Sequence, residues 1–155
     1  MQQWLTLYNE YSASMTLVTG LNDRDLIVFF YLFGKKVFDQ QPRHSAHAIC
    51  SGINSTLTSC VSLLIPVEGI SDSDCSKALD KLVEYGFVRR TRPKDKRKAA
   101  SEEGGRPPSF VYETMGVVEI IQRILDEIEL KKGKFLKMLN GLRQLEEEVG
   151  LGQRK

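Results

Sequence analysis

Residues 69–92 read GISDSDCSKALDKLVEYGFVRRTR, and this stretch carries the most specific pattern of the chain. Ser71 is a favourable N-cap with Asp74 three residues later, so the spacing predicts a helix over about 72–85. Gly86 is the residue type that most often ends a helix in the left-handed conformation. The apolar stripe of this helix consists of Cys75, Ala78, Leu79 and Leu82. The opposite face is polar, and a strand-like segment with several arginines follows directly.

A basic segment follows the helix and is bounded by two predicted strands. Phe87 and Val88 open the first strand, and residues 109–114 alternate as a second strand with Phe110 and Tyr112 on one face. From residue 89 to residue 106, eight basic residues stand against three acids: Arg89, Arg90, Arg92, Lys94, Lys96, Arg97, Lys98 and Arg106 against Asp95, Glu102 and Glu103. An isolated basic run is usually a solvated loop, but binding to phosphates would relieve its self-repulsion. The order of helix, glycine, strand, basic tip and strand predicts a hairpin that contacts nucleic acid.

Two parts of this region resemble known DNA-binding proteins. Residues 76–90 (SKALDKLVEYGFVRR) resemble the recognition helix and first wing strand of MarR, GbsR and TrmB-like winged-helix regulators. Residues 105–112 (GRPPSFVY) resemble the returning strand of their wing. The resemblance covers residues 22–115 in outline and 69–113 closely. It implies a DNA-binding winged helix with dimerising terminal helices, and a wing tip (Lys94, Lys96, Arg97 and Lys98) that reaches the minor groove.

The residues predicted to contact DNA lie on this helix and hairpin. A helix in the major groove needs an outward face that is short, polar and cationic near its N-terminal half, as Ser73, Ser76 and Lys77 provide. The alternative is an ordinary amphipathic surface helix. The predicted set is Ser71, Ser73, Ser76, Lys77 and Lys81 from the helix at about 72–85, with Arg89, Arg90, Arg92, Lys94, Lys96, Arg97, Lys98 and Arg106 from the wing at about 89–113.

Two further helices are predicted before this region. The first has its larger apolar residues on one face, at spacings of three and four: Trp4, Tyr8, Tyr11, Met15 and Val18. Gly20 suits its end, and Asn22 suits the cap of a second helix over about 23–37. Residues 26–33 of the second helix are apolar nearly all round, so we expect it to be the central helix of the core.

The segment between this helix and Gly69 carries weaker signals. Residues 38–52 contain Pro42, both histidines and Cys50, and we expect a loop there with at most a short helical turn. Residues 53–64 place Leu57, Cys60, Val61 and Leu64 on one face, which predicts a helix. Pro66 would end that helix or begin a turn.

The last third of the chain has a seven-residue apolar repeat. One seam position is Ile121, Ile128, Phe135, Leu142 and Val149, and the other is Val117, Ile124, Lys131, Met138 and Leu145. This repeat is typical of a coiled coil, in which two copies would bury the seam, so we expect a homodimer. A long helix packed on its own monomer is the alternative. The predicted dimerisation residues are Trp4, Tyr8, Tyr11, Ile121, Ile124, Ile128, Phe135, Met138, Leu142 and Leu145.

His44, His47 and Cys50 recur at a spacing of three and are the candidate metal ligands, because Zn²⁺ prefers imidazole and thiolate donors. On a helix, this spacing would place all three side chains on about the same side. No CxxC motif is present, and Cys60 and Cys75 fall on predicted apolar faces, where cysteine packs as a small hydrophobic residue. The main prediction is therefore no metal and no cofactor, with a metal-sensing or thiol-sensing regulator as an alternative.

The composition is that of a globular protein. The chain has 155 residues, of which 41% are hydrophobic and 27% charged, and its formal net charge is +2. Its most apolar segment, 26–33, is much shorter than the roughly 20 residues that span a bilayer, and residues 1–7 do not form a signal peptide. Three cysteines without framework spacing favour a reducing compartment. We therefore expect a cytoplasmic protein without membrane contact.

These patterns predict a mainly α-helical chain with a small β-hairpin wing, a winged helix-turn-helix with N- and C-terminal dimerisation helices. The expected parts are an N-terminal helix (1–20), a DNA-binding domain (21–115), a coiled-coil-like dimerisation helix (116–149) and a tail (150–155). The predicted function is a homodimeric transcription regulator that binds specific double-stranded DNA, with an unidentified effector. The alternative is a docking module of a larger assembly, which would have little need of the basic wing. No glycine-rich phosphate loop, HExxH or GxSxG is present, so no enzymatic activity is predicted.

Overall fold

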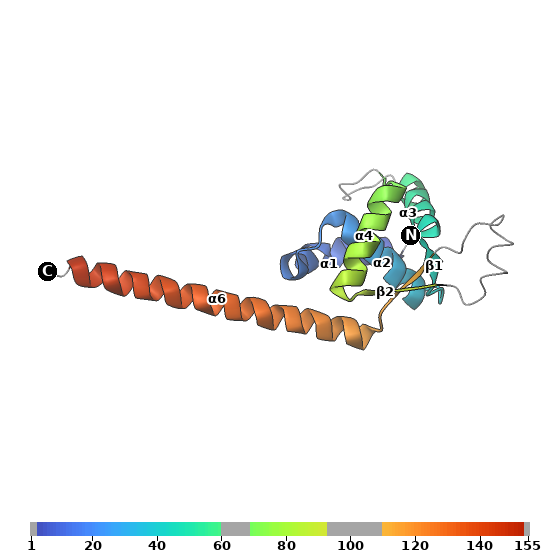
Figure 1. Ribbon diagram of the computed structural model, residues 1–155. Coiled ribbons are helices and arrows are strands. Elements are labelled where there is room, and N and C mark those ends of the chain that lie inside the picture. The colour runs from blue at the N-terminus through green and yellow to red at the C-terminus, as the bar shows by residue number, and fades with distance from the viewer. Residues whose placement is uncertain (1–2, 60–68, 93–109, 154–155) are drawn as a thin grey trace.

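The computed structural model describes residues 3–59, 69–92 and 110–153 (Figure 1). Its elements are α1 (Gln3–Thr19), α2 (Asp23–Val37), β1 (His44–Ser45), α3 (Ala46–Ser59), α4 (Asp72–Tyr85), β2 (Val88–Thr91), β3 (Val111–Thr114) and α6 (Val117–Gln153). The described chain is mainly helical, with a small antiparallel sheet in the strand order β1-β3-β2. This architecture is compatible with the predicted winged helix-turn-helix. None of the described helices is both long enough and apolar enough to cross a membrane.

α2 is the central helix of the body, as the sequence predicted, and its bounds agree with the predicted ones. Asn22 begins it with a capping box: the Asn22 side chain accepts a hydrogen bond from the Asp25 backbone N–H at 2.9 Å, and the Asp25 carboxylate accepts one from the Asn22 N–H at 3.1 Å. Leu26, Val28 and Leu32 are fully buried. α1, α3 and α4 all pack against this helix, so it organises the core.

α1 packs Trp4 and Tyr8 on α2. The rings of Trp4 and Tyr31 meet edge to face with 5.6 Å between centroids, and those of Tyr8 and Phe30 do so at 6.3 Å. Trp4 and Tyr8 therefore belong to the core of their own chain and not to the predicted dimer face, since both are buried. The helix ends at Gly20, which adopts a φ of 76° as expected.

The expectation of a loop over residues 38–52 is wrong from His44 onward. His44 pairs with Tyr112 and Ser45 with Val111, which makes β1 a short edge strand. α3 begins at Ala46, seven residues before the predicted start, because the Ser45 hydroxyl accepts a hydrogen bond from the Ala48 N–H at 3.2 Å. Ile49 and Ile53, four residues apart, are both fully buried. Residues 60–64 of the predicted helix, with Cys60, lie outside the described residues.

α4 and the hairpin strands agree closely with the predicted elements. The Ser71 hydroxyl accepts a hydrogen bond from the Asp74 N–H at 3.1 Å and begins α4, and Gly86 ends it with a φ of 95°. β2 and β3 pair antiparallel, with Val88 opposite Thr114 and Thr91 opposite Val111. β1 was not predicted as a third strand, because two residues are too few to show an alternating pattern.

α6 is one unbroken helix from Val117 to Gln153, which runs past α1 and extends away from the body (Figure 1). Arg123 joins its first turns to the end of α4. The Arg123 Nε donates to the Tyr85 carbonyl at 3.0 Å, and its guanidinium lies 4.0 Å from the centre of the Tyr85 ring. Arg123 also pairs with Glu127 at 3.0 Å. Gly133 and Gly141 lie within the helix without interrupting it.

Candidate nucleic-acid interface

α4 presents a polar face to solvent, opposite its buried stripe. Cys75, Ala78, Leu79 and Leu82 are buried against the body, whereas Ser71, Ser73, Ser76, Lys77 and Lys81 are all exposed. Short hydroxyl side chains near the start of the helix leave room for the edges of bases, and they donate and accept hydrogen bonds. The Lys77 amine forms no ion pair with a described residue, so it remains available to a ligand anion.

The exposed face of α4 is not cationic by itself. Asp72, Asp80 and Glu84 are exposed beside Lys77 and Lys81. Residues of neighbouring elements offset part of this negative charge: Arg24 of α2 pairs with Asp74 at 3.7 Å, and Arg90 of β2 pairs with Asp80 at 3.2 Å. Among the described cations of the interface, Lys77 and Arg92 are the ones that form no ion pair with a described residue.

Lys81 is paired with a residue of another helix, a contact that its own sequence pattern does not indicate. Its Nζ lies 2.8 Å from the Asp25 carboxylate, whose side chain is almost fully buried. The same Asp25 oxygen accepts the hydrogen bond that closes the α2 capping box. Lys81 thus joins α4 to the start of α2, and a phosphate would have to share an amine that is already paired.

Arg90 of β2 and Arg92, just after its end, are held in place by one aromatic ring. Their guanidinium carbons lie 4.7 Å and 5.0 Å from the centre of the Phe110 ring. Stacking on an aromatic face restricts an arginine without neutralising it. Arg92 forms no ion pair with a described residue and can donate to phosphate oxygens, whereas a phosphate would have to share Arg90 with Asp80. Phe110 was predicted as a strand residue but not as part of the site.

Arg89 lies on the other face of the sheet and is engaged by Glu113. Their hydrogen bond is 2.5 Å long, and it is the main reason why the pKa of the Arg89 guanidinium is raised. Arg43 and Lys36 also approach the Glu113 carboxylate, at 3.8 Å and 4.0 Å. Three cations thus surround one buried carboxylate. Two of these cations, Arg43 and Arg89, border a hollow of about 680 Å³ whose other lining residues are His44, Ser45, Thr91, Arg92, Val111 and Glu113.

The contact between Arg43 and Glu113 was not predictable from the sequence. Arg43 is far from Glu113 along the chain, and only the pairing of β1 with β3 brings them together. The predicted wing-tip residues Lys94, Lys96, Arg97, Lys98 and Arg106 lie outside the described residues.

The predicted metal ligands do not converge. His44 lies in β1 and not on a helix, and its Nε2 is 2.6 Å from the Gln41 carbonyl. His47 is exposed on α3, 3.8 Å from Asp72. The buried Cys50 thiol donates to the Ile70 carbonyl at 3.3 Å, and burial raises its pKa to about 11. Within the described ranges, no group of three or more histidine, cysteine or acidic side chains could hold a metal ion.

The predicted dimerisation residues of α6 are open to solvent in the single chain. Ile121, Ile128, Phe135, Met138, Leu142 and Leu145 are exposed, and Ile124 is partly buried against the core. Tyr11 of α1 is exposed as well. Most of the apolar seam is therefore uncovered within a single chain.

Comparisons with known proteins connect the fold to one earlier structure. No protein-family model matches the chain. No curated protein matches it either. A solved structure with a similar fold is a "possible transcriptional regulator" from Methanosarcina mazei Go1, with a TM-score of 0.57 and 14% sequence identity. The match covers 84% of this chain and 86% of that one. At this identity the likeness shows a shared fold alone.

Proposed function

We propose that the protein is a sequence-specific, homodimeric transcription regulator of the winged-helix type, similar to MarR-like proteins. α4 lies in the major groove, where Ser73, Ser76 and Lys77 read base edges. β2, β3 and the connection between them form the wing, which binds the phosphate backbone and the minor groove. The similar fold of a possible transcriptional regulator supports this proposal.

The observation that carries the proposal is the placement of two cationic groups beside an exposed polar helix. Arg90 is fixed between Asp80 of α4 and Phe110, and Arg92 shares the same ring. A groove-binding helix needs flanking phosphate contacts to set its depth and register, because phosphate contacts position the protein and base contacts specify the sequence. The two arginines stand where such contacts would flank α4.

Binding to random-sequence duplex DNA, measured by fluorescence anisotropy across a salt series, tests the proposal. Affinity should fall steeply with salt, and Arg90→Ala and Arg92→Ala should each reduce the log–log slope by about 0.9 for every phosphate that the variant no longer binds. Arg143→Ala is the matched control. It removes the same charge from an exposed position on α6 that lies outside the interface.

A second measurement separates base reading from phosphate binding. Once a preferred sequence has been selected from a random library, Lys77→Ala should weaken binding to it by about 1–3 kcal/mol and leave non-specific binding nearly unchanged. Equal losses on both DNAs would instead assign Lys77 to the backbone.

The exposed carboxylates of α4 favour one competing function. Asp72, Asp80 and Glu84 would repel phosphates but would suit a basic protein partner. Folded protein that binds no DNA at low salt would contradict the regulator proposal and favour a docking module.

A further inference from the structure

The distal part of α6 carries a row of large apolar side chains that no described residue covers. Phe135, Met138, Leu142, Leu145 and Val149 are each between 51% and 60% exposed. They recur at spacings of three and four, so they lie along one side of the helix. Burying this row requires a second helix, because the helix extends away from its own body (Figure 1).

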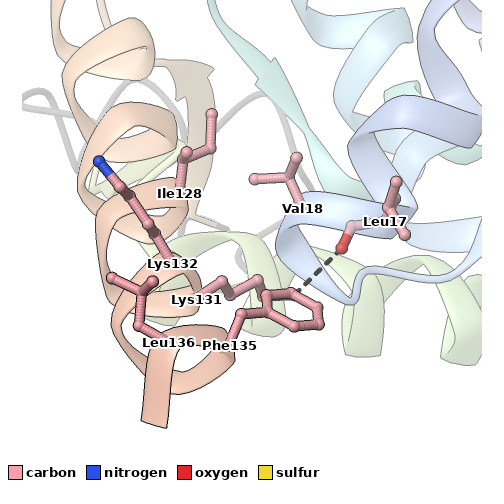
Figure 2. Close-up of a pocket in the computed structure, with 7 residues that line it drawn as sticks. All are labelled: Leu17, Val18, Ile128, Lys131, Lys132, Phe135 and Leu136. Carbon is pink, nitrogen blue, oxygen red and sulfur yellow. Dashed lines mark hydrogen bonds between the residues drawn. The ribbon is translucent and has the colours of Figure 1, made fainter. Parts of the chain in front are cut away.

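An apolar groove begins where this row meets α1. The groove has a volume of about 470 Å³ and is lined by Leu17, Val18, Ile128, Lys131, Lys132, Phe135 and Leu136. Figure 2 shows Leu17 and Val18 of α1 facing these α6 side chains across the opening. Lys131 Nζ donates to the Leu17 carbonyl at 3.1 Å and ties the two helices together there. The groove is continuous with the exposed row, since Phe135 belongs to both.

Charge is distributed unevenly along the same part of α6. Lys131, Lys132, Lys134 and Lys137 form a basic block beside the groove, and Glu146, Glu147 and Glu148 form an acidic block near the far end. In a parallel pair of helices, each block would lie next to its own copy. In an antiparallel pair, the acidic block of one chain would lie next to the basic block of the other.

We propose that two copies of this chain pair through α6 in antiparallel orientation, with the two-fold axis near residue 140. The far end of each helix then lies against the α1–α6 groove of its partner. This inference rests on the proposed homodimeric regulator and adds its geometry, because it fixes the direction and register of the two helices.

The apolar row agrees with this register. Phe135 lies opposite the partner's Leu145, and Met138 lies opposite the partner's Leu142. In each layer, a residue from one seam position of the repeat packs against a residue from the other seam position of the partner. Antiparallel packing of two identical helices requires this arrangement. Lys131, the one polar seam residue, lies opposite the partner's Val149 and places its amine at the Leu17 carbonyl, clear of the apolar layer.

The charges beside the seam agree with the same register. Lys132 and Glu146 each follow a seam residue by four positions, so they lie on the same flank of the helix. Lys134 and Glu148 each directly precede a seam residue and lie on the other flank. An antiparallel pair brings equal flanks together, which places Lys132 near the partner's Glu146 and Lys134 near the partner's Glu148.

A parallel, in-register pair would make less favourable contacts between these residues. Lys131 would face the partner's Lys131 within the seam, where two like charges are unfavourable. Glu127 would be the partner of Lys132, but Arg123 of its own chain already holds it at 3.0 Å. The antiparallel pair also leaves Ile121 and Ile124 beyond the overlap, and Ile124 is already partly buried on its own body.

Distances between spin labels on the full-length chain test the direction of the helices. Labels are placed at Asn140→Cys or Gln122→Cys, each in a Cys60→Ser background, and measured by pulsed electron paramagnetic resonance. The antiparallel pair predicts a short distance, under about 30 Å, for residue 140. It predicts an axial separation of about 54 Å for residue 122, from about 36 residues at 1.5 Å each.

Each outcome of this measurement either supports or overturns the antiparallel pair. Short distances at both positions would overturn the antiparallel register and keep the homodimer. The absence of any dipolar distance, together with a monomeric mass in sedimentation, would overturn both the register and the homodimer. DNA binding measured on the same samples reports separately on the reading function of α4.

Charge reversal tests the register independently. Lys132→Glu with Lys134→Glu should weaken self-association at least tenfold, which corresponds to about 1.4 kcal/mol, because like charges are brought together. Adding Glu146→Lys and Glu148→Lys to the same chain should restore it, because each reversed pair is again attractive. Lys137→Glu, outside the two flanks, is the control and should have little effect. Failure of the combined variant to recover would overturn the proposed register.

Discussion

The body and the distal part of α6 contain similar apolar residues but bury them in different ways. In the body, Leu26, Ile49 and Phe87 are 0% exposed within a single chain. In α6, Phe135 and Leu142 remain 60% and 55% exposed. The body can therefore be stabilised by contacts within one molecule. The distal apolar side chains of α6 are largely exposed within a single chain, so they add little to its stability unless a partner covers them.

The two regions are joined at a defined place. Arg123 stacks on Tyr85 and donates to the Tyr85 carbonyl, so the first turns of α6 are fixed to the end of α4. A pairing of α6 helices would thus set the position of α4 in each half of a dimer. The body therefore has a core of its own, whereas the distal part of α6 has none within a single chain.

Truncation of a core aromatic residue should have the strongest effect. Phe87 packs against Phe29 and Tyr85, with ring centroids 5.1 Å and 4.8 Å away. Phe87→Ala should lower the free energy of unfolding by about 3–5 kcal/mol, because it removes buried area and leaves a cavity. Urea denaturation followed by circular dichroism measures this change.

Leu142→Ala is the matched change in α6. At concentrations where the protein is monomeric, it should alter the free energy of unfolding of the body by no more than about 0.5 kcal/mol. Sedimentation should nevertheless show weaker self-association. An equal decrease of stability in the dilute monomer would mean that α6 folds back onto its own body, and the two regions would no longer differ.

The body was largely predictable because its helices carry local signals. Asn22, Ser71 and Gly86 marked helix ends correctly, since caps depend on a few neighbouring residues. β1 and the early start of α3 were missed, because a two-residue strand is stabilised by pairing with distant β3 and not by its own sequence. The caps show that local chemistry can be read from a sequence, whereas pairing between distant segments cannot.

The candidate interface was predicted only in part for the same reason. The exposure of the serines and Lys77 follows from the helix period, and the structure leaves these side chains exposed. The partners of Lys81 and Arg89 did not follow from the sequence, because Asp25 and Glu113 come from other elements. Likewise, the periodicity of Trp4 and Tyr8 identified an apolar face but not whether the same chain or a second copy covers it.

A more moderate effect is expected from the same substitution at two glycines. In the body, a Cβ added at Gly34 would lie 2.6 Å from the Trp4 Cβ and 3.3 Å from the Trp4 Cα, so α1 would have to move. Gly34→Ala should therefore lower the free energy of unfolding by about 1–3 kcal/mol. In α6, a Cβ at Gly133 meets nothing within 4 Å, and Gly133→Ala should stabilise the helix by up to about 1 kcal/mol.

Thermal unfolding of the two variants and the parent chain measures these opposite signs. Decreased stability in both variants would show that Gly133 is packed in the intact protein, for example where a second helix approaches α6. Increased stability in both would show that α1 can shift away from α2 at little cost, which would contradict the description of Trp4 as a fixed part of the core.

The weakest effect concerns the two buried thiols of the body. Burial is the largest cause that raises the pKa of Cys50 to about 11 and that of Cys75 to about 12. At pH 8, the folded chain should hold at least about 100-fold less thiolate at these sites than an unfolded one, and a Cys60→Ser variant should react correspondingly slowly with a disulfide reagent. Because the folded state binds these protons more tightly, its stability is complete below about pH 9 and declines as the pH rises toward 11 and 12.

Rapid reaction of Cys50 in native protein at pH 8, with slow reaction of Cys75, would instead identify an accessible thiol and favour a thiol-sensing regulator. Slow reaction of both, with full reactivity restored in urea, would show that the body encloses both thiols and would contradict a thiol sensor at Cys50.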